Sequence, residues 1–445
     1  MTAVGIDAIE LWSGKLRLDL AETFAPVKGE DPGKYTKGIG IEYSSLPDVY
    51  EDIVTMGANA AKQLMDRKGL TPDDIGRIDV ATESAFDNSK PVSTYIAGCL
   101  EQVYDGDFHH ANKGERKFAC LSGTQCLDDA YNWIRAGRNR GRAALVIATD
   151  TALYERGDPG EATQGAGAVA MLIDEEPDIV ALSTEQGYGS ADETDFLKPN
   201  QQFPSVDGKR SIQVYLARMR EALEDYESVA GDTHPEDFVY FPFHTPYPGM
   251  VRKAALLGYR HITRDTEIED ALADDIGMQP REENYETRED YEEAIRAYMD
   301  ELKGTRQYQE WYEQAIEPTI QVSGQVGNWY TASVHLARLS ALRAAASEDV
   351  DLAGEKMLVG SYGSGAQAEI HAETVRDGWR EGVEGLDVDA QLADRYDLSF
   401  EEYELVHDVH NHQKEVEVEE FTQPEGEFVF TGWGRMNERR YEYVE

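Results

Sequence analysis

The chain has 445 residues, which is long enough for two full-sized domains or for one fold built from two similar halves. Its 86 acidic and 42 basic residues give a net charge of −44 that argues against a nucleic-acid partner, while 41% hydrophobic residues argue against a disordered acidic chain. It has no apolar window of about 18 residues and no basic region at the N-terminus, so we expect a cytosolic protein with no membrane partner.

Apolar runs alternate with amphipathic stretches along the chain. The amphipathic stretches predict helices at 50–69, ended by Gly69, and at 211–231, ended by Gly231. The apolar runs predict buried strands at 75–84, 142–152, 167–174, 237–246, 356–365 and 427–435. This alternation predicts an α/β fold.

Polar residues stand where several of these strands end, and in α/β sheets ligands gather at the carboxyl ends of strands. These positions are therefore candidates for a ligand site. They are Glu83, Ser84, Asp150, Thr151, His244, Thr245 and Ser364.

Two strongly charged segments interrupt the pattern. Residues 264–317 have apolar residues at helical spacing, which predicts a pair of surface helices whose apolar stripe packs on the body. Residues 387–420 predict an exposed strand or loop. The latter run contains His407, His410 and His412, but it lacks matched cysteines and helical i,i+4 ligand spacing, so no metal is expected.

Cys120 is the candidate nucleophile among three cysteines that fit neither a disulfide framework nor a zinc site. An apolar strand-like run gives way to a helix at Cys120. The free N–H groups of a helix N-terminus lower the pKa of a thiol and can hold an oxyanion. A buried structural cysteine is the alternative interpretation, and it is the one we favour for Cys99 and Cys126.

Glu83 and His244 are candidate acid–base groups. Glu83 ends an apolar strand, where partial desolvation would raise the pKa of its carboxyl toward the range useful in catalysis. His244 follows a buried strand and precedes a proline-containing loop. Taken singly, Glu83 could be a helix or turn cap and His244 a core histidine. The small-residue loops 324–333 and 361–365 would let a ligand approach the backbone closely, and neither is a nucleotide-binding motif.

An ordered set of motifs resembles the hydroxymethylglutaryl-CoA synthases, a family of thiolase-fold condensing enzymes. The resemblance runs from near the N-terminus to about Ala368. The motifs are KYTKGIG at 34–40, VATESAFD around Glu83, FAC ending at Cys120, ATDTALY at 148–154, EATQGAGAVAMLI, DFLKP, VDGKRSIQVYL, FHTP with Lys253 downstream, VGNWYTAS and SYGSG.

This resemblance implies a five-layered αβαβα thiolase-like fold of two related halves, usually in a homodimer. The first half, 1–174, would carry Glu83 and Cys120. The second, 175–445, would carry His244, Asn328 and Ser364 and include the acidic helical insertion at about 264–317. The family condenses acetyl-CoA with acetoacetyl-CoA and water through an acetyl-cysteine, on the route to mevalonate and isoprenoid lipids. It needs no metal or redox cofactor.

Residue roles follow from the matching positions. Cys120 matches the acetylated nucleophile, Glu83 the general acid/base, and His244 the residue that holds the acetoacetyl thioester. Asn328 and the backbone at Ser364 match groups that orient acyl carbonyls. The remaining matches are Tyr154, Thr163, Ser211 and Tyr330 in the substrate pocket, Lys253 as a CoA contact, and Asp150 and Asp195 as supporting carboxylates.

Two departures and two alternatives accompany this assignment. Animal members of the family usually carry a second CoA lysine five residues after the histidine, where this chain has Gly249. The acidic segment and the region after Ala368 match no motif.

A ketoacyl-ACP synthase-like enzyme would use Cys, His and Asn without a glutamate base, so Glu83 argues against it. A non-catalytic acidic binding protein is the alternative from another class.

The charge also predicts an environment. In dilute buffer so acidic a surface repels itself, whereas in molar salt the screening length falls to about 3 Å. We therefore expect a protein from a salt-rich cytoplasm.

Overall fold

The computed structural model describes residues 2–410 and 418–445. Its main sheet has eight strands in the order β11-β12-β8-β1-β7-β6-β4-β5. The first part of this sheet contains β1 (Val4–Ser13), β4 (Ile75–Ala81), β5 (Asn112–Arg116), β6 (Ala143–Ala152) and β7 (Gly165–Glu175). The second part contains β8 (Val180–Ser190), β11 (Lys356–Gly363) and β12 (Gln367–Val375). The two parts meet where β1 pairs with β8 over two residues only.

The predicted strand at 237–246 is an extended segment that runs parallel to β11. Isolated bridges join Tyr240 to Met357 and Phe243 to Gly360. The Val239 N–H donates to the Lys356 carbonyl at 2.8 Å. This segment therefore extends the second part of the sheet and delivers His244 to its end.

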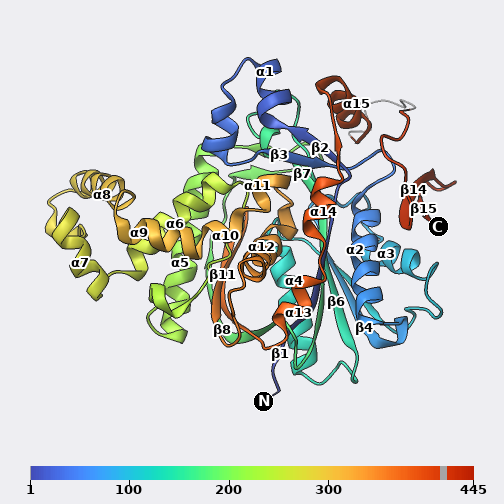
Figure 1. Cartoon of the computed structure of the whole chain (residues 1–445), viewed down its shortest axis with the longest axis horizontal. Coiled ribbons are helices and arrows are strands. Elements are labelled where there is room, and N and C mark those ends of the chain that lie inside the picture. Colours follow the sequence, from blue (N-terminus) through green and yellow to red (C-terminus); the bar gives the residue numbers. More distant parts are fainter. Residues whose placement is uncertain (1, 411–417) are drawn as a thin grey trace.

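Helices cover both faces of each part of the sheet. α2 (Ile53–Lys68) and α3 (Val92–Leu100) pack on the outer face of the first part, and α5 (Gly208–Ala230) and α6 (Pro248–Ile262) on the outer face of the second. α4 (Ser122–Arg135) and α12 (Ser333–Ser347) lie between the two parts, in a core shared by strands of both. The result is the predicted αβαβα order of five layers (Figure 1).

The ends of α2 follow from local sequence. The Asp52 side chain accepts the N–H groups of Val54 and Thr55 at the N-terminus. Gly69 ends the helix with φ +66°, a conformation that glycine adopts at little cost. The predicted ending of α2 at Gly69 is confirmed.

Smaller elements surround the layers. β2 (Leu16–Asp19), β3 (Tyr43–Leu46) and β13 (Tyr396–Asp397) form a small sheet. β14 (Glu427–Trp433) and β15 (Arg439–Val444) form a C-terminal hairpin, and β9 (Phe196–Leu197) pairs with β10 (Ser205–Val206). Further α-helices include α1 (Ala25–Lys28), α10 (Glu317–Ile320), α11 (Ser323–Val326), α13 (Trp379–Glu384), α14 (Val388–Ala393) and α15 (Phe400–His410).

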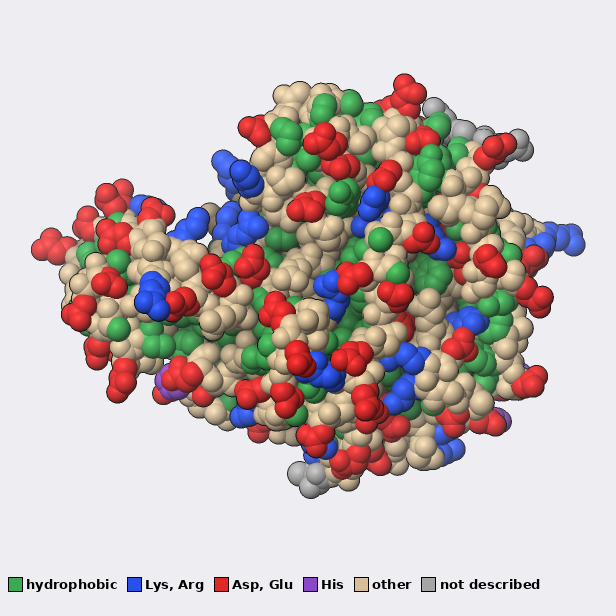
Figure 2. Space-filling model, viewed as in Figure 1, with side chains coloured by type: hydrophobic (Ala, Val, Ile, Leu, Met, Phe, Trp, Pro, Cys, Tyr) green, Lys and Arg blue, Asp and Glu red, His purple; other side chains and the backbone are tan. Residues whose placement is uncertain are grey.

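The acidic insertion contains three helices, so the predicted pair was wrong. They are α7 (Glu267–Ile276), α8 (Arg288–Leu302) and α9 (Arg306–Ala315). The run is divided because Thr266, Thr287 and Thr305 each cap a new helix N-terminus. These helices project from the body (Figure 1), and acidic side chains are dense over them (Figure 2). A small separate core, which includes Leu272 and Leu302, joins them to α6.

The prediction of an exposed strand or loop at 387–420 was also wrong for 388–393 and 400–410, which form α14 and α15. Ser399 and Glu402 cap α15 reciprocally, with the Ser399 N–H donating to the Glu402 carboxylate at 2.8 Å. His407 is buried and contacts the Tyr154 carbonyl at 2.8 Å, and His410 contacts the Pro47 carbonyl at 3.1 Å. His412 lies outside the described residues.

Among the described residues, no helix combines the length and apolarity needed to cross a bilayer. Within the same residues, no three His, Cys, Asp or Glu side chains are grouped in a way that could hold a metal ion.

Candidate active site

A cavity of about 500 Å³ is lined by residues of both halves of the chain. Ten of the twelve residues to which the family resemblance gave a role line it: Glu83, Cys120, Tyr154, Thr163, Ser211, His244, Lys253, Asn328, Tyr330 and Ser364. The other two, Asp150 and Asp195, are fully buried behind the lining. Of the other strand-end positions, Ser84 and Thr151 line a different cavity and Thr245 is buried.

Cys120 lies on a tight turn that leads into α4. The Leu121 N–H donates to the Phe118 carbonyl at 3.1 Å, and Ala119 has φ +44°, which is unfavourable for a residue with a Cβ. Gly363, at the end of β11, packs on this turn so closely that a Cβ there would lie 2.5 Å from the Phe118 carbonyl oxygen. The second half of the chain therefore holds the turn that presents Cys120.

The Glu83 carboxyl is the nearest polar partner of this thiol. Cys120 Sγ donates to Glu83 Oε1 at 2.8 Å. Burial, reinforced by the charge of Asp150, raises the pKa of the Glu83 carboxyl to about 8. The predicted direction for Glu83 is confirmed, and a carboxyl of this kind can both accept and return a proton near neutral pH.

The predicted lowering of the Cys120 pKa was wrong. Burial and the neighbouring Glu83 carboxylate raise the pKa of the thiol well above its ordinary value. These two effects exceed the favourable field of the α4 N-terminus, which falls off within one turn. The thiol is therefore protonated at rest, and Glu83 is the group in place to take its proton. Cys99 and Cys126 are buried in the core as predicted.

Asp150 holds the Glu83 turn from behind. Its carboxylate accepts the Glu83 N–H at 2.7 Å and the Ser84 hydroxyl at 2.7 Å. The Thr331 N–H donates to the other oxygen at 3.1 Å. Asp150 thus ties a strand end of the first half to a segment of the second.

Asp195 supports the opposite wall. It accepts the Tyr362 hydroxyl at 3.1 Å, and its backbone carbonyl accepts the Asp207 N–H at 3.0 Å. Asp207 caps α5, the helix that carries Ser211. Asp195 therefore links the end of β11 to the start of α5.

His244 reaches the cavity from the end of the extended segment beside β11. The backbone N–H of His244 donates to the Gly360 carbonyl at 2.7 Å, and the backbone carbonyl of His244 accepts the Tyr215 hydroxyl at 2.9 Å. Nδ1 contacts the Ser333 hydroxyl. Burial lowers the pKa of the imidazole to about 3, so the ring is neutral. A neutral imidazole held at Nδ1 by Ser333 presents Nε2 for a hydrogen bond.

The loop 324–333 is closely packed on the first half. A Cβ at Gly327, whose φ is +77°, would lie 1.9 Å from the Gln164 carbonyl oxygen, and the Asn328 N–H donates to the Thr163 carbonyl at 3.0 Å. Small residues here accommodate neighbouring backbone, whereas we had expected them to accommodate a ligand. The same packing places Asn328 and Tyr330 at the cavity.

The comparisons with known proteins agree with this geometry. Residues 1–178 match the family described as hydroxymethylglutaryl-coenzyme A synthase N terminal, and residues 188–432 match its C-terminal counterpart. A hydroxymethylglutaryl-CoA synthase of Haloferax volcanii is 80% identical over 445 residues, all of both chains. The chain belongs to the hydroxymethylglutaryl-CoA synthase family.

More distant relatives and solved structures extend the match. The cytoplasmic hydroxymethylglutaryl-CoA synthase of Gallus gallus is 32% identical over 88% of this chain and 75% of its own. A structure of MvaS in complex with 3-hydroxy-3-methylglutaryl coenzyme A has TM-score 0.84 and 29% identity over all of both chains. An HMG-CoA synthase complexed with CoA has TM-score 0.74 and 29% identity over 99% of this chain and 100% of its own.

The fold, the family and the enzyme class predicted from the sequence are therefore confirmed. The chain is an acyltransferase with hydroxymethylglutaryl-CoA synthase activity. The relative at 80% identity is a haloarchaeal one, in keeping with the salt-rich cytoplasm expected from the charge.

Several residues at the site of this synthase were missed by the sequence analysis. Ser333 contacts His244, and Thr331 contacts Asp150. Both lie inside the VGNWYTAS motif, so their position next to Asn328 was the available signal. Lys34 also lines the cavity and adds a cation to it. Its Nζ lies 2.6 Å from Glu30 Oε2, and its position in the motif KYTKGIG could have indicated it.

Gly249 occupies a site with no space for a side chain. A Cβ there would lie 2.5 Å from the Gly38 carbonyl oxygen. The backbone of the KYTKGIG segment thus fills the place from which a second lysine would extend.

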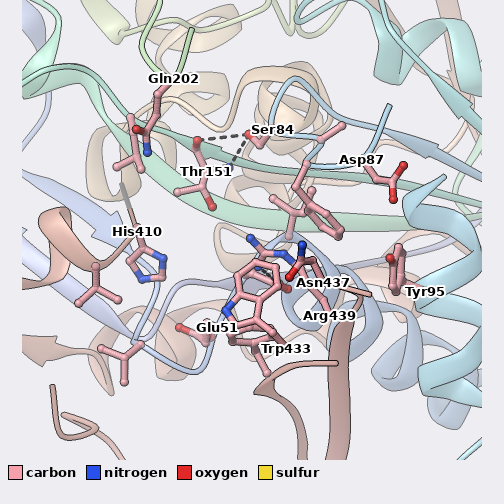
Figure 3. Close-up of a pocket in the computed structure, with 18 of the residues that line it drawn as sticks. Glu51, Ser84, Asp87, Tyr95, Thr151, Gln202, His410, Trp433, Asn437 and Arg439 are labelled. Atoms are coloured by element: carbon pink, nitrogen blue, oxygen red, sulfur yellow. Dashed lines mark hydrogen bonds and ion pairs between the residues drawn. The ribbon is translucent and has the colours of Figure 1, made fainter. Parts of the chain in front are cut away.

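A larger cavity of about 780 Å³ lies on the far side of the Glu83 turn. Figure 3 shows Ser84 hydrogen-bonded to Thr151 at one end and the hairpin residues Trp433 and Arg439 across from them. Neither Cys120 nor His244 lines it, so we place the chemistry in the smaller cavity.

Proposed function

We propose that this synthase condenses acetyl-CoA with acetoacetyl-CoA and water to give 3-hydroxy-3-methylglutaryl-CoA and CoA, through an acetyl group carried on Cys120. The observation that carries the proposal is the 2.8 Å contact between Cys120 Sγ and Glu83 Oε1 in a cavity that also contains His244. The first group supplies a nucleophile, the second a base, and the third a hydrogen-bond donor.

Acetylation begins with attack of Cys120 Sγ on the acetyl thioester as Glu83 takes the thiol proton. The new carbon–sulfur bond replaces the bond to CoA, and the departing CoA sulfur takes the proton from Glu83, which returns this carboxyl to its ionised form for the next step. A thiol with a raised pKa needs this assistance, because almost none of it is ionised at neutral pH. We assign stabilisation of the oxyanion to backbone N–H groups of the Cys120 turn and of the segment at Ser364.

Condensation uses the same base a second time. Glu83 removes a proton from the acetyl methyl, and the resulting carbon attacks the ketone of acetoacetyl-CoA. Nε2–H of neutral His244 donates to that ketone oxygen, and the proton held by Glu83 neutralises the alkoxide that forms. Water then cleaves the thioester at Cys120, which regenerates the thiol and releases the free carboxylate.

The remaining cavity residues bind and orient the substrates. Asn328 directs an acyl carbonyl, and Lys253 contacts CoA, with Lys34 as a second cation at the same cavity. We assign the pocket walls to Tyr154, Thr163, Ser211 and Tyr330, and the supporting role to Asp150 and Asp195.

A ketoacyl-ACP synthase-like reaction is the second candidate from the sequence. Such enzymes lack a glutamate base, and the direct contact of Glu83 with the nucleophile favours the synthase reaction. A non-catalytic binding protein would not require three chemically matched groups in one cavity.

We extend the proposal to the organisation of the enzyme. We assign residues 1–174 and 175–445 to the two related halves and propose that the chain acts as a homodimer in a salt-rich cytoplasm. A net charge of −44 supports the last assignment.

The test is a consumption assay in molar KCl. Acetoacetyl-CoA should disappear only when acetyl-CoA is present, and Cys120→Ala should remove the activity. Loss of acetoacetyl-CoA without acetyl-CoA, or full activity of the variant, would contradict the proposed reaction.

A further inference from the structure

The segment at the start of α12 supports two of the proposed catalytic groups. Thr331 donates to Asp150, the carboxylate that accepts the Glu83 N–H. Two residues later, the Ser333 hydroxyl contacts Nδ1 of His244. Alternate residues of one short segment therefore reach both the base and the histidine.

The next polar side chain on this helix, His335, packs on the start of α4, the helix that follows Cys120. His335 is fully buried, and its Nε2 lies 2.7 Å from where a Cβ on Gly123 would be. Gly123 is the second residue of α4 and follows Cys120 by three positions. Because only glycine leaves room for this contact, the start of α4 packs directly on the imidazole. A change in the position of the ring would move the turn that carries Cys120.

Arg338 fixes the orientation of that ring. Its Nη1 donates to His335 Nδ1 at 2.8 Å. Since a guanidinium only donates, Nδ1 is the acceptor and the imidazole is neutral. Arg338 in turn pairs with Glu373 of β12, with Nε 2.8 Å from Oε2, and both side chains are essentially inaccessible to water.

The network returns to α4 at a second point. His371 joins Glu373, with Nε2 at 3.2 Å, to Glu369, with Nδ1 at 3.6 Å. Gln186 donates both to Glu369, at 3.4 Å, and to Asp128, at 2.8 Å. Asp128 lies in α4, where burial and the charge of Glu369 raise the pKa of its carboxyl well above the ordinary value. The helix behind Cys120 is thus held by polar side chains of the second half near its start and again near its middle.

We propose that His335 and Arg338 are positioning residues that fix the start of α4, and with it Cys120 Sγ, relative to the half that carries His244. The proposal rests on the role proposed above for Cys120. A core that only needed to be stable could use apolar residues here, because buried ion pairs are often no more stabilising than well-packed hydrophobic side chains. Polar contacts are directional, so this network can fix the position of the helix that follows Cys120, which apolar packing would not do.

The test follows the reactivity of Cys120 toward iodoacetamide as a function of pH, without substrate, in His335→Leu and His335→Asn. Burial and contact with Glu83 keep the thiol pKa high, and displacement of the turn weakens both. In the leucine variant the midpoint of alkylation should therefore fall, by about one pH unit. Its kcat should fall about 10- to 100-fold, with KM within about threefold. Asparagine keeps an acceptor for Arg338 near the position of Nδ1 but does not fill the place of Nε2 beside Gly123, so it should fall between wild type and the leucine variant in both measurements.

Arg343→Met is the matched control. Arg343 lies on the same helix but pairs at the surface with Asp389, so wild-type values are expected. Arg338→Lys is the second test variant and decides the matter if His335→Leu does not fold. Lysine keeps a charge beside Glu373 but loses the second donor, so the same shifts should appear at smaller size.

Two results would overturn the proposal. One is a folded test variant with the wild-type alkylation profile and kcat, and the other is an asparagine variant as impaired as the leucine variant. Alkylation is measured without substrate and read at the Cys120 peptide by mass, so it reports the environment of the free thiol and does not depend on whether acetyl-CoA can acetylate it. Failure of the positioning role is therefore distinguishable from failure of the proposed reaction.

Discussion

Replacing Glu83 by glutamine keeps an acceptor beside Cys120 but removes the ionisable group. The raised pKa of Glu83 means that the folded protein binds the proton more tightly than the unfolded chain does. The charged carboxylate therefore destabilises the fold. The contribution of the Glu83 side chain to the free energy of unfolding is most favourable below pH 4.5, where the carboxyl is protonated. This contribution is lost as the pH rises from 4.5 through about 8.

The size of this effect follows from the pKa. Each tenfold difference in proton affinity corresponds to about 1.36 kcal/mol, so a carboxyl moved from 4.5 to about 8 costs at most roughly 5 kcal/mol when fully charged. The side chain faces a cavity that admits water, which lowers the cost. We expect Glu83→Gln to be more stable than wild type by about 2 to 4 kcal/mol at about pH 9, and nearly equal at about pH 5.

Catalysis should change in the opposite sense. A positioned base contributes about 10²- to 10⁴-fold, so condensation should slow by that factor. Acetylation should slow less, because loss of the neighbouring carboxylate also lowers the Cys120 pKa. Urea unfolding in molar KCl at the two pH values, with acetyl-enzyme followed by mass, tests both parts. A stability difference that is independent of pH would refute the assignment of a raised Glu83 pKa, and unchanged condensation would refute its role as base.

Three further experiments test the site. Cys120→Ala should abolish acetyl-enzyme formation while Cys126→Ala retains it, as measured by labelling with radioactive acetyl-CoA; label retained in the first variant would show another nucleophile. His244→Ala should weaken acetoacetyl-CoA use more than acetyl transfer, and equal loss in the two half-reactions would indicate a structural histidine. Gly123→Ala should lower kcat about 100-fold, because its Cβ would lie 2.3 Å from the Thr331 carbonyl oxygen, whereas Gly98→Ala in α3 meets no atom within 4 Å and should be silent; equal kcat values would contradict the close packing of α4.

The residues proposed as catalytic could be selected from the sequence because reactive residues stand at strand ends within distinctive motifs. Glu83, Cys120 and His244 come from separate segments of the chain, and the α/β pattern already indicated that such ends converge. The direction of the Cys120 pKa was not predictable in the same way. The helix N-terminus is visible in the sequence, whereas the distance to Glu83 and the burial that outweighs the helix field depend on the folded structure.

Other features escaped for different physical reasons. His335 and Arg338 look like ordinary residues of an amphipathic helix, and only the packing of α12 between the two parts of the sheet makes them buried. The helix at 400–410 was missed although Ser399 and Glu402 form a readable capping box, because the high charge of the run suggested exposure. The three threonine caps in the acidic insertion were equally readable.

Salt should raise both the melting temperature and the activity of this enzyme. With a net charge of −44, carboxylates spread over the surface repel one another across about 30 Å at 0.01 M salt but only about 3 Å at 1 M. Exposed pairs such as Arg288–Glu292 lose attraction through the same screening, but pairs of this kind contribute little to begin with. Buried pairs such as Arg338–Glu373 are scarcely screened.

The balance therefore favours stabilisation by salt, since the repulsion of many unbalanced carboxylates outweighs the weakening of a few surface pairs. Binding of CoA phosphates by Lys253 should weaken with salt, but one local contact opposes the relief of charge over the whole surface. Melting temperature and condensation rate measured from about 0.05 to 3 M KCl should both rise steeply. Sodium and potassium chloride should act alike if screening is the cause. A flat or falling melting temperature would show that surface repulsion does not limit the stability of this fold.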